Sequence, residues 1–208
     1  DNCPNDEARD QFNIPSWLDQ MVAKNWLGDK TGQGFFKKTK TASGEKEIRT
    51  LNLHTLEYEP RRKPKFASVE AAKQVDALTE RLKMLVSAPD KAGEFYKHFQ
   101  YGLFAYVSHR IPEISDELYR VDDALMAGFG WEIGAFESWD VLGVQRTVEA
   151  MEKAGHVVAD WVKEMLAAGI KSFYKLEQGK RYCYDPATRS YQALPGGDAI
   201  GSRGLDFH

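Results

Sequence analysis

Residues 121–144, VDDALMAGFGWEIGAFESWDVLGV, indicate how this chain folds. Apolar residues at helical spacing predict a helix that starts near Ser115, the expected N-cap, and continues to the glycines at positions 128, 130 and 134. Residues 136–141 then have the length of one short helix. Glycine allows backbone conformations and close approaches that other residues do not. The three glycines therefore predict a sharp reversal between two packed helices.

The sequence on both sides of this stretch is also helical in pattern. Apolar residues recur every three or four positions over residues 69–85, 95–107 and 144–165, and Pro89-Asp90 restarts a helix between the first two of these segments. Tyr182-Cys183-Tyr184 and Tyr191 flank a turn at Asp185-Pro186. The fold class predicted is mainly α, a helical bundle with a short terminal β-hairpin. No strand–helix alternation of a doubly wound sheet is present.

One helical segment occurs twice. WLDQMV at 17–22 leads through a glycine turn into Phe35-Phe36-Lys37, and WVKEML at 161–166 leads through another into Tyr182-Cys183-Tyr184. The two Trp–Met pairs lie 144 positions apart, because Trp17 and Met21 correspond to Trp161 and Met165. Such an internal repeat predicts two copies of one structural unit. The first copy has only its tail, so we expect the chain to be a piece of a longer protein.

The repeat and the loops predict four segments. Residues 1–40 would be the tail end of the first unit, with a helix that Gly28 stops, and 41–67 an extended linker. Residues 68–194 would be the second unit and 195–208 a flexible tail. Within this division, residues 39–47 are polar and are expected to form an exposed loop at the boundary. Residues 48–59 alternate weakly between apolar and polar side chains, as in a strand.

Composition excludes several classes of protein. Of the 208 residues, 42% are apolar and 28% charged, as in a globular domain, and the net charge of −3 argues against nucleic-acid binding. The dense basic run Arg61-Arg62-Lys63-Pro64-Lys65 is interpreted as a solvated loop. Cys3 and Cys183 are expected to be reduced, which favours the cytoplasm. No apolar run approaches the ~20 residues that span a bilayer.

Candidate chemical groups in the sequence are few, and each has a simpler interpretation. Gly128-x-Gly130 with Gly134 has the wrong spacing for a dinucleotide fingerprint and follows a helix rather than a strand. Glu137 and Asp140 could form an acid–base pair, but they are expected to cap and balance the charge of a helix N-terminus beside Gly134; Glu132 carries no stronger signal.

Histidines and the serine–histidine pair give no better candidates. None of the five histidines has metal-ligand spacing. They are His54, His98, His109, His156 and His208. Ser108 and His109, near Asp116, could suggest a triad, but adjacent helical residues point in different directions. We therefore predict no catalytic, cofactor-binding or metal-binding residue in this chain.

Residues 121–144 resemble a pattern of the L-3-hydroxyacyl-CoA dehydrogenase C-terminal domain, roughly D-x-A-h-x-x-G-x-G-x-P-x-G-P-F-x-h-x-D-x-h-G. The residues aligned with it are Asp123, Ala124, Gly128, Gly130, Gly134, Phe136, Asp140 and Gly143. The two prolines of the pattern are Glu132 and Ala135 here. Residues 27–36, LGDKTGQGFF, resemble the segment G-x-K-T-G-x-G-F-Y that closes the same domain; its counterpart at 176–184 keeps Gly179 and the aromatic ending.

The order of these segments resembles fused β-oxidation enzymes, in which two helical units follow one Rossmann domain. The resemblance implies the helical, non-catalytic part of an NAD-dependent 3-hydroxyacyl-CoA dehydrogenase, acting on an acyl-CoA substrate. It further implies that NAD and the catalytic His–Glu pair belong to an upstream Rossmann domain, that an Asn assisting at the thioester lies near the start of the first unit, and that a crotonase-type hydratase domain follows. None of those catalytic positions falls within this sequence, so the fragment alone should be inactive and hold no cofactor.

Two alternatives stay open at this point. The chain could be a helical interaction or dimerisation module without enzymatic role, since the helical domains of single-unit family members pair as dimers. It could also be an acyl-CoA-binding module in its own right.

Overall fold

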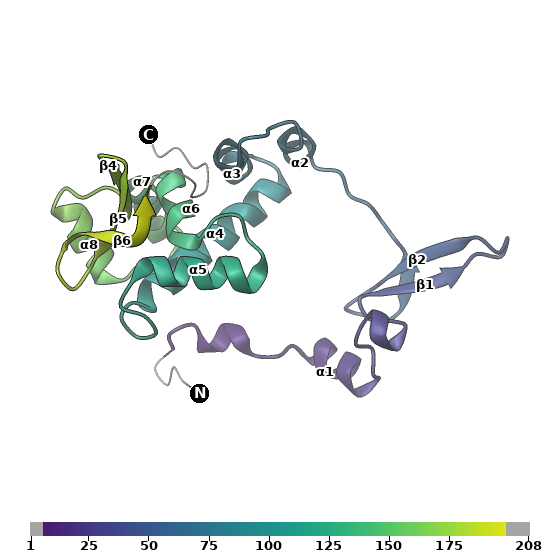
Figure 1. The fold of residues 1–208 in the computed structure, drawn as a ribbon. Helices are drawn as coiled ribbons and strands as arrows, with labels where there is room; N and C mark the ends of the chain where they lie inside the picture. The colour runs from purple at the N-terminus through teal and green to yellow at the C-terminus, as the bar shows by residue number, and fades with distance from the viewer. Residues whose placement is uncertain (1–5, 199–208) are drawn as a thin grey trace. The chain divides into compact units, whose positions relative to one another are not determined.

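The computed structural model describes residues 6–198, and side chains through Gly196. The chain divides between Lys65 and Phe66 into two compact units. The described residues are mostly helical, with eight α-helices and two small three-stranded antiparallel sheets (Figure 1). None of these helices has the length and apolar character needed to cross a bilayer.

The first unit is a short helix followed by a small sheet. Its elements are the 3₁₀ turns η1 (Arg9–Phe12) and η2 (Asp29–Thr31), helix α1 (Ser16–Ala23), and strands β1 (Phe36–Lys40), β2 (Lys46–Leu51) and β3 (Tyr58–Pro60). The strands pair in the order β1-β2-β3. Trp17 of α1 contacts Phe35 edge to face, with ring centroids 5.9 Å apart, and the Tyr58 hydroxyl donates to the Gly34 carbonyl at 2.7 Å. These contacts hold α1 and the third strand against the chain that enters β1.

Expectations for the first unit are corrected at three points, and one is confirmed. Helix α1 ends at Ala23 rather than at Gly28, because Asn25 adopts a left-handed conformation with φ of 57°. The polar segment 39–47 is a loop only over 41–45, because its two ends belong to β1 and β2. Residues 46–60 contain β2 and β3, which confirms the strand signal over 48–59 inside the linker expected at 41–67, and the division falls at the end of the basic run, between Lys65 and Phe66.

The second unit contains seven helices and the C-terminal sheet in its described part. The helices are α2 (Ala67–Ala72), α3 (Leu78–Ser87), α4 (Lys91–His109), α5 (Leu118–Phe129), α6 (Ala135–Leu142), α7 (Val144–Lys153) and α8 (Asp160–Ala167). The strands β4 (Tyr174–Glu177), β5 (Lys180–Asp185) and β6 (Ser190–Asp198) pair in that order. Helix α6 is central, with contacts to α3, α4, α5 and α7. Its Trp139 stacks on Phe104 of α4, with centroids 4.9 Å apart, and both side chains are fully buried.

Several helical predictions for this unit are confirmed and others are corrected. Asp90 caps α4 by accepting from the Gly93 amide at 3.0 Å, and the short helix predicted over 136–141 is α6. The segment 144–165 is two helices, because α7 stops before Gly155, whose φ is 86°. Ser115 is not an N-cap, since α5 begins at Leu118 and Ser115 bonds within the preceding turn.

The C-terminal region contains more strand than the sequence predicts. The predicted terminal hairpin is the β5–β6 pair of a three-stranded sheet. Residues 195–198, expected to begin a flexible tail, belong to β6. The remainder of that predicted tail, 199–208, lies outside the described residues.

The predicted repeat is present in the structure. Helices α1 and α8 each have eight residues with Trp second, and Met21 and Met165 are both buried. The hydrogen bonds that end α1 recur at the end of α8, each shifted by the repeat of 144 residues. They run from the amides of Lys24, Asn25 and Trp26 to the carbonyls of Gln20, Val22 and Met21, and from those of Ala168, Gly169 and Ile170 to Glu164, Leu166 and Met165. Each helix is followed by a three-stranded antiparallel sheet, so the two segments adopt like conformations.

Candidate functional site: a buried carboxylate cluster

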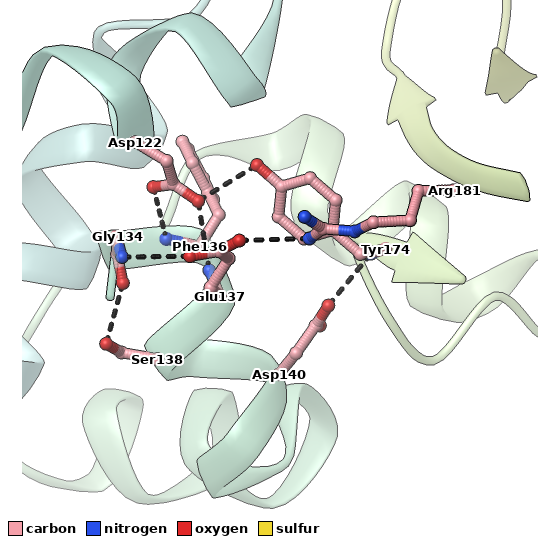
Figure 2. A network of polar contacts seen from close by, with 8 residues as sticks. All are labelled: Asp122, Gly134, Phe136, Glu137, Ser138, Asp140, Tyr174 and Arg181. Atoms are coloured by element: carbon pink, nitrogen blue, oxygen red, sulfur yellow. Dashed lines mark hydrogen bonds and ion pairs between the residues drawn. The ribbon is translucent and has the colours of Figure 1, made fainter. Parts of the chain in front are cut away.

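The buried Asp122 side chain connects three elements of the second unit. Its carboxylate accepts hydrogen bonds from the Phe136 amide at 2.8 Å and the Glu137 amide at 3.1 Å, both in the first turn of α6. It also accepts from the Tyr174 hydroxyl of β4 at 2.9 Å. Figure 2 shows these donors converging on the carboxylate. Asp122 therefore fixes α5 to the start of α6 and to the sheet.

Gly134 allows this arrangement because it has no side chain. Glu137 accepts from the Gly134 amide at 3.1 Å, which is half of a capping box. The other half, which the N-cap side chain normally supplies, comes from Asp122. A Cβ at Gly134 would overlap the Asp122 carboxylate. Gly134 and Asp122 therefore cap α6 together, with α5 supplying the capping side chain.

The other two carboxylates of the cluster hold the C-terminal sheet. Asp140, in the last turns of α6, accepts from the amides of Phe173 at 2.7 Å and Tyr174 at 2.8 Å. Glu137 forms an ion pair with Arg181 of β5 at 2.9 Å (Figure 2). The prediction that Glu137 caps the α6 N-terminus is confirmed, whereas the same prediction for Asp140 is wrong, because Asp140 binds the backbone that leads into β4.

Burial changes the acidity of the groups in this cluster. It raises the pKa of Asp122 to about 7, although the hydrogen bond from the Phe136 amide acts in the opposite direction and the nearby Glu137 carboxylate adds to the increase. Burial likewise raises the pKa of Asp140 and of the Tyr174 hydroxyl well above their ordinary values. Arg181 is the cation paired within the cluster, so full ionisation of every carboxylate is unfavourable there.

We expect the stability of the chain to fall as the pH rises from about 4 to about 7. Between the ordinary Asp pKa of 3.8 and the folded value of about 7, the folded protein retains a proton on Asp122 that the unfolded chain has released. The state that binds more protons is favoured at low pH, so the free energy of unfolding should decrease by up to about 1.4 kcal/mol per pH unit. Urea unfolding across this range measures the slope. The side chain of the variant Asp122→Asn cannot titrate, so its free energy of unfolding should change less with pH. An equal slope in both proteins would contradict the raised pKa of Asp122.

The carboxylates of the cluster are bonded to other groups of the protein. Each carboxylate already accepts backbone, hydroxyl or guanidinium donors, and the amides of Gly134, Phe136 and Glu137 are bonded to carboxylates. Those amides are the groups that a phosphate would use at a helix N-terminus. Across residues 6–196, whose side chains are described, no three His, Cys, Asp or Glu side chains are placed to hold a metal ion.

The structure does not bring the predicted serine–histidine candidates together. The Ser108 hydroxyl is fully buried, donates to the Ala105 carbonyl at 2.7 Å and accepts from the Ala159 amide at 3.1 Å. The His109 ring lies 3.2 Å from the Val157 carbonyl, and Asp116 is exposed in the turn before α5. Ser108 therefore joins α4 to the start of α8 and has no histidine partner.

The remaining candidate residues lie apart from the cluster. His54 is in an exposed turn and His98 is exposed on α4, while the His156 ring contacts Tyr101 edge to face. Glu132 is exposed in the turn between α5 and α6. Cys183 is a buried free thiol whose pKa burial raises to about 12, so it stays protonated. Cys3 and His208 lie outside the described residues.

Sequence reasoning missed Asp122, Tyr174 and Arg181. The alignment assigned the acidic position to Asp123, which is exposed, whereas the buried acid is Asp122. A signal was available: Asp122 lies four residues after the buried Leu118 and so on the apolar face of α5, where an acid needs a partner. The D-x-A spacing before Ala124 also selects Asp122. No comparable signal marks Tyr174 or Arg181.

The fold and this cluster define a mostly helical unit with a C-terminal sheet clamped by buried acids. Comparison with known proteins shows that the chain is homologous to part of a 3-hydroxyacyl-CoA dehydrogenase. It is 37% identical over 185 residues, 89% of its length, to a probable 3-hydroxyacyl-CoA dehydrogenase of Bacillus subtilis. It is 25% identical over 120 residues, 58% of its length, to a protein of Rickettsia felis named as a fatty acid oxidation complex trifunctional enzyme.

The homology covers a minor part of each relative. The matched region is 23% of the Bacillus subtilis protein and 15% of the Rickettsia felis protein. No family model matches the chain, and no solved structure is significantly similar to it. The activity of the whole relatives therefore does not transfer directly to these 208 residues.

Proposed function

We propose that this chain is the helical, non-catalytic portion of an NAD-dependent 3-hydroxyacyl-CoA dehydrogenase of fatty-acid β-oxidation. In the complete enzyme it would buttress the acyl-CoA site and fix the packing of the neighbouring domains. The observation that carries the proposal is the 37% identity across 89% of the chain to about a quarter of a dehydrogenase. The buried cluster supports a structural role, since its acids are already bonded to other groups of the protein.

The division into segments is part of the same proposal. Residues 1–65 would be the end of one helical dehydrogenase unit, and residues from 66 onward a second unit. The like conformations of α1 and α8, with three matching terminal hydrogen bonds, support a duplication. A Rossmann domain before the first unit and a crotonase-type domain after the second remain predictions from the resemblance.

NAD in the complete enzyme would accept the hydride removed from the 3-hydroxyl carbon. The described residues of this chain do not fit that cofactor. The glycines at 128, 130 and 134 follow helix α5 rather than a strand, and carboxylates occupy the amides at the start of α6. We therefore assign no step of hydride transfer to this chain.

Reconstitution tests the proposed function. The chain would be mixed with the Bacillus subtilis relative from which the 185 homologous residues have been deleted, and NADH formation from a 3-hydroxyacyl-CoA would be followed. The chain alone is expected to match a no-protein control, the truncated relative to have lost most activity, and the mixture to recover part of it. Turnover by the chain alone, or full activity of the truncated relative, would contradict the proposal.

A further inference from the structure

A pocket of about 270 Å³ lies where α3, α4, α6 and α7 meet, and no residue of the carboxylate cluster lines it. Three of these helices each contribute to it a cationic residue and the residue four positions later. Residues four apart lie on one face of a helix. The cations therefore lie on the helix faces that meet at the pocket. The three pairs are Lys83 and Ser87 of α3, Lys97 and Tyr101 of α4, and Arg146 and Ala150 of α7.

The charge of this pocket is opposite to that of the unit around it. Residues 66–208 contain 16 Lys and Arg and 21 Asp and Glu, a net charge of −5. Among the acids that the structure describes, none lines the pocket, whereas three of the cations do. A hollow lined by charges of one sign concentrates ions of the opposite sign. The pocket therefore favours an anionic ligand.

The Arg146 side chain is held at the wall of this pocket. Its Nε donates to the carbonyl of Leu142, which also lines the pocket, at 2.6 Å. This bond uses one of the five N–H groups of the guanidinium and fixes its position. Within the described part of the chain, Arg146 forms no ion pair. Its two terminal nitrogens are thus available for the two-point contact that guanidinium groups make with phosphate.

The two lysines of the pocket are little neutralised by acids. Lys97 is half-buried and has no ion pair among the described residues. Lys83 pairs with Glu80 at 2.8 Å, but Glu80 is exposed and lies outside the pocket, and exposed pairs of this kind are weak. An anion in the pocket would therefore meet at least two cations that no acid of the protein already holds.

The rest of the lining suits an organic body attached to the anion. Val86, Leu142 and Ala150 supply an apolar wall, and the half-buried Tyr101 ring lies beside it. The hydroxyls of Ser87 and Thr147 already donate to backbone carbonyls, at 2.7 and 2.6 Å. The cations therefore supply most of the donors for a ligand, and three of them suit a doubly charged group better than a singly charged one.

We propose that this pocket binds a small organic phosphate, with Lys83, Lys97 and Arg146 contacting the phosphate oxygens and the organic body against the apolar wall. A phosphate monoester carries nearly two negative charges at neutral pH and offers three acceptor oxygens. The proposal goes beyond the proposed function and does not depend on it, because it rests on the charges and contacts of this pocket alone.

Two probes of similar shape and different charge test the proposal. The ¹⁵N-labelled chain would be titrated at about pH 7.5 with phenyl phosphate, which is mostly a dianion there, and with phenyl sulfate, which is a monoanion. Phenyl phosphate is expected to shift the Gly143 amide and Arg146 Nε resonances saturably and to bind about three- to tenfold more tightly than phenyl sulfate. Inorganic phosphate, which lacks the organic body, should bind more weakly than phenyl phosphate at the same resonances.

A pair of lysine variants provides the control. Lys97→Gln should weaken the binding of phenyl phosphate about three- to tenfold, and it should still fold, because Lys97 has no ion pair to lose within the described residues. Lys153 is exposed on α7 outside the pocket, so Lys153→Gln removes the same charge and should leave the affinity unchanged. Equal affinities for phenyl phosphate and phenyl sulfate, or equal losses in the two variants, would overturn the proposal. So would binding of inorganic phosphate as tight as that of phenyl phosphate, or the absence of a saturable shift at Arg146 Nε.

Discussion

Asp122→Ala should destabilise the chain by about 3–6 kcal/mol, a large part of the stability of an ordinary domain. Two amides of α6 and the Tyr174 hydroxyl would each lose their acceptor. Leaving a buried donor unsatisfied costs about 1–3 kcal/mol. Because the same change removes a carboxylate that burial disfavours, the loss should be less than the sum of three such costs. Urea unfolding followed by circular dichroism would measure it.

The adjacent residue provides the control. Asp123 is exposed on the same helix and has the same side chain, so Asp123→Ala should change the free energy of unfolding by no more than about 0.5 kcal/mol. A loss at Asp123 as large as the loss at Asp122 would mean that the buried cluster is not what stabilises this region.

Gly134→Ala is expected to cost about 3 kcal/mol. The added Cβ would overlap the Asp122 carboxylate, and moving that carboxylate would weaken its bonds to the Phe136 and Glu137 amides. The cost should therefore depend on Asp122. In a double-mutant cycle, Gly134→Ala in the Asp122→Ala background should cost much less than it does in the wild-type chain.

Gly128 belongs to the same glycine-rich stretch and is predicted to behave in the opposite way. It lies inside helix α5, and a Cβ there would meet no neighbouring atom. Gly128→Ala should therefore stabilise the chain by up to about 1 kcal/mol, because alanine favours a helix over glycine. Equal effects at Gly128 and Gly134, or additivity in the cycle, would show that Gly134 is not required by its contact with Asp122.

The helices were predictable from the sequence to the extent that apolar spacing alone defines them. The spacing located α4, α5 and α6, and the Trp–Met repeat located α1 and α8. The apolar spacing did not predict the break between α7 and α8, because apolar residues recur at helical spacing from Val144 to Val158, on both sides of Gly155. Periodicity records which face is buried and does not record where the backbone leaves the helix. Asn25, which ends α1, was missed for the same reason.

The small sheets and the cluster were harder to predict, because they depend on pairing between distant residues. The strand β1 is basic and exposed along much of its length, so its sequence, FKKTK, lacks the apolar alternation that marks a half-buried strand. The contacts of Asp122 with Tyr174, and of Glu137 with Arg181, join residues 52 and 44 positions apart. A single sequence carries little information about such pairs, although an acid on the apolar face of α5 indicates that a partner must exist.

Hydrogen exchange of four backbone amides tests the central claim most directly, namely that buried carboxylates clamp α5, α6 and the C-terminal sheet together. The amides are those of Phe136, Glu137, Phe173 and Tyr174, each bonded to Asp122 or Asp140. If the claim holds, these amides exchange only through global unfolding and are among the most protected of the chain. Exchange within minutes, at rates typical of exposed turns, would contradict it.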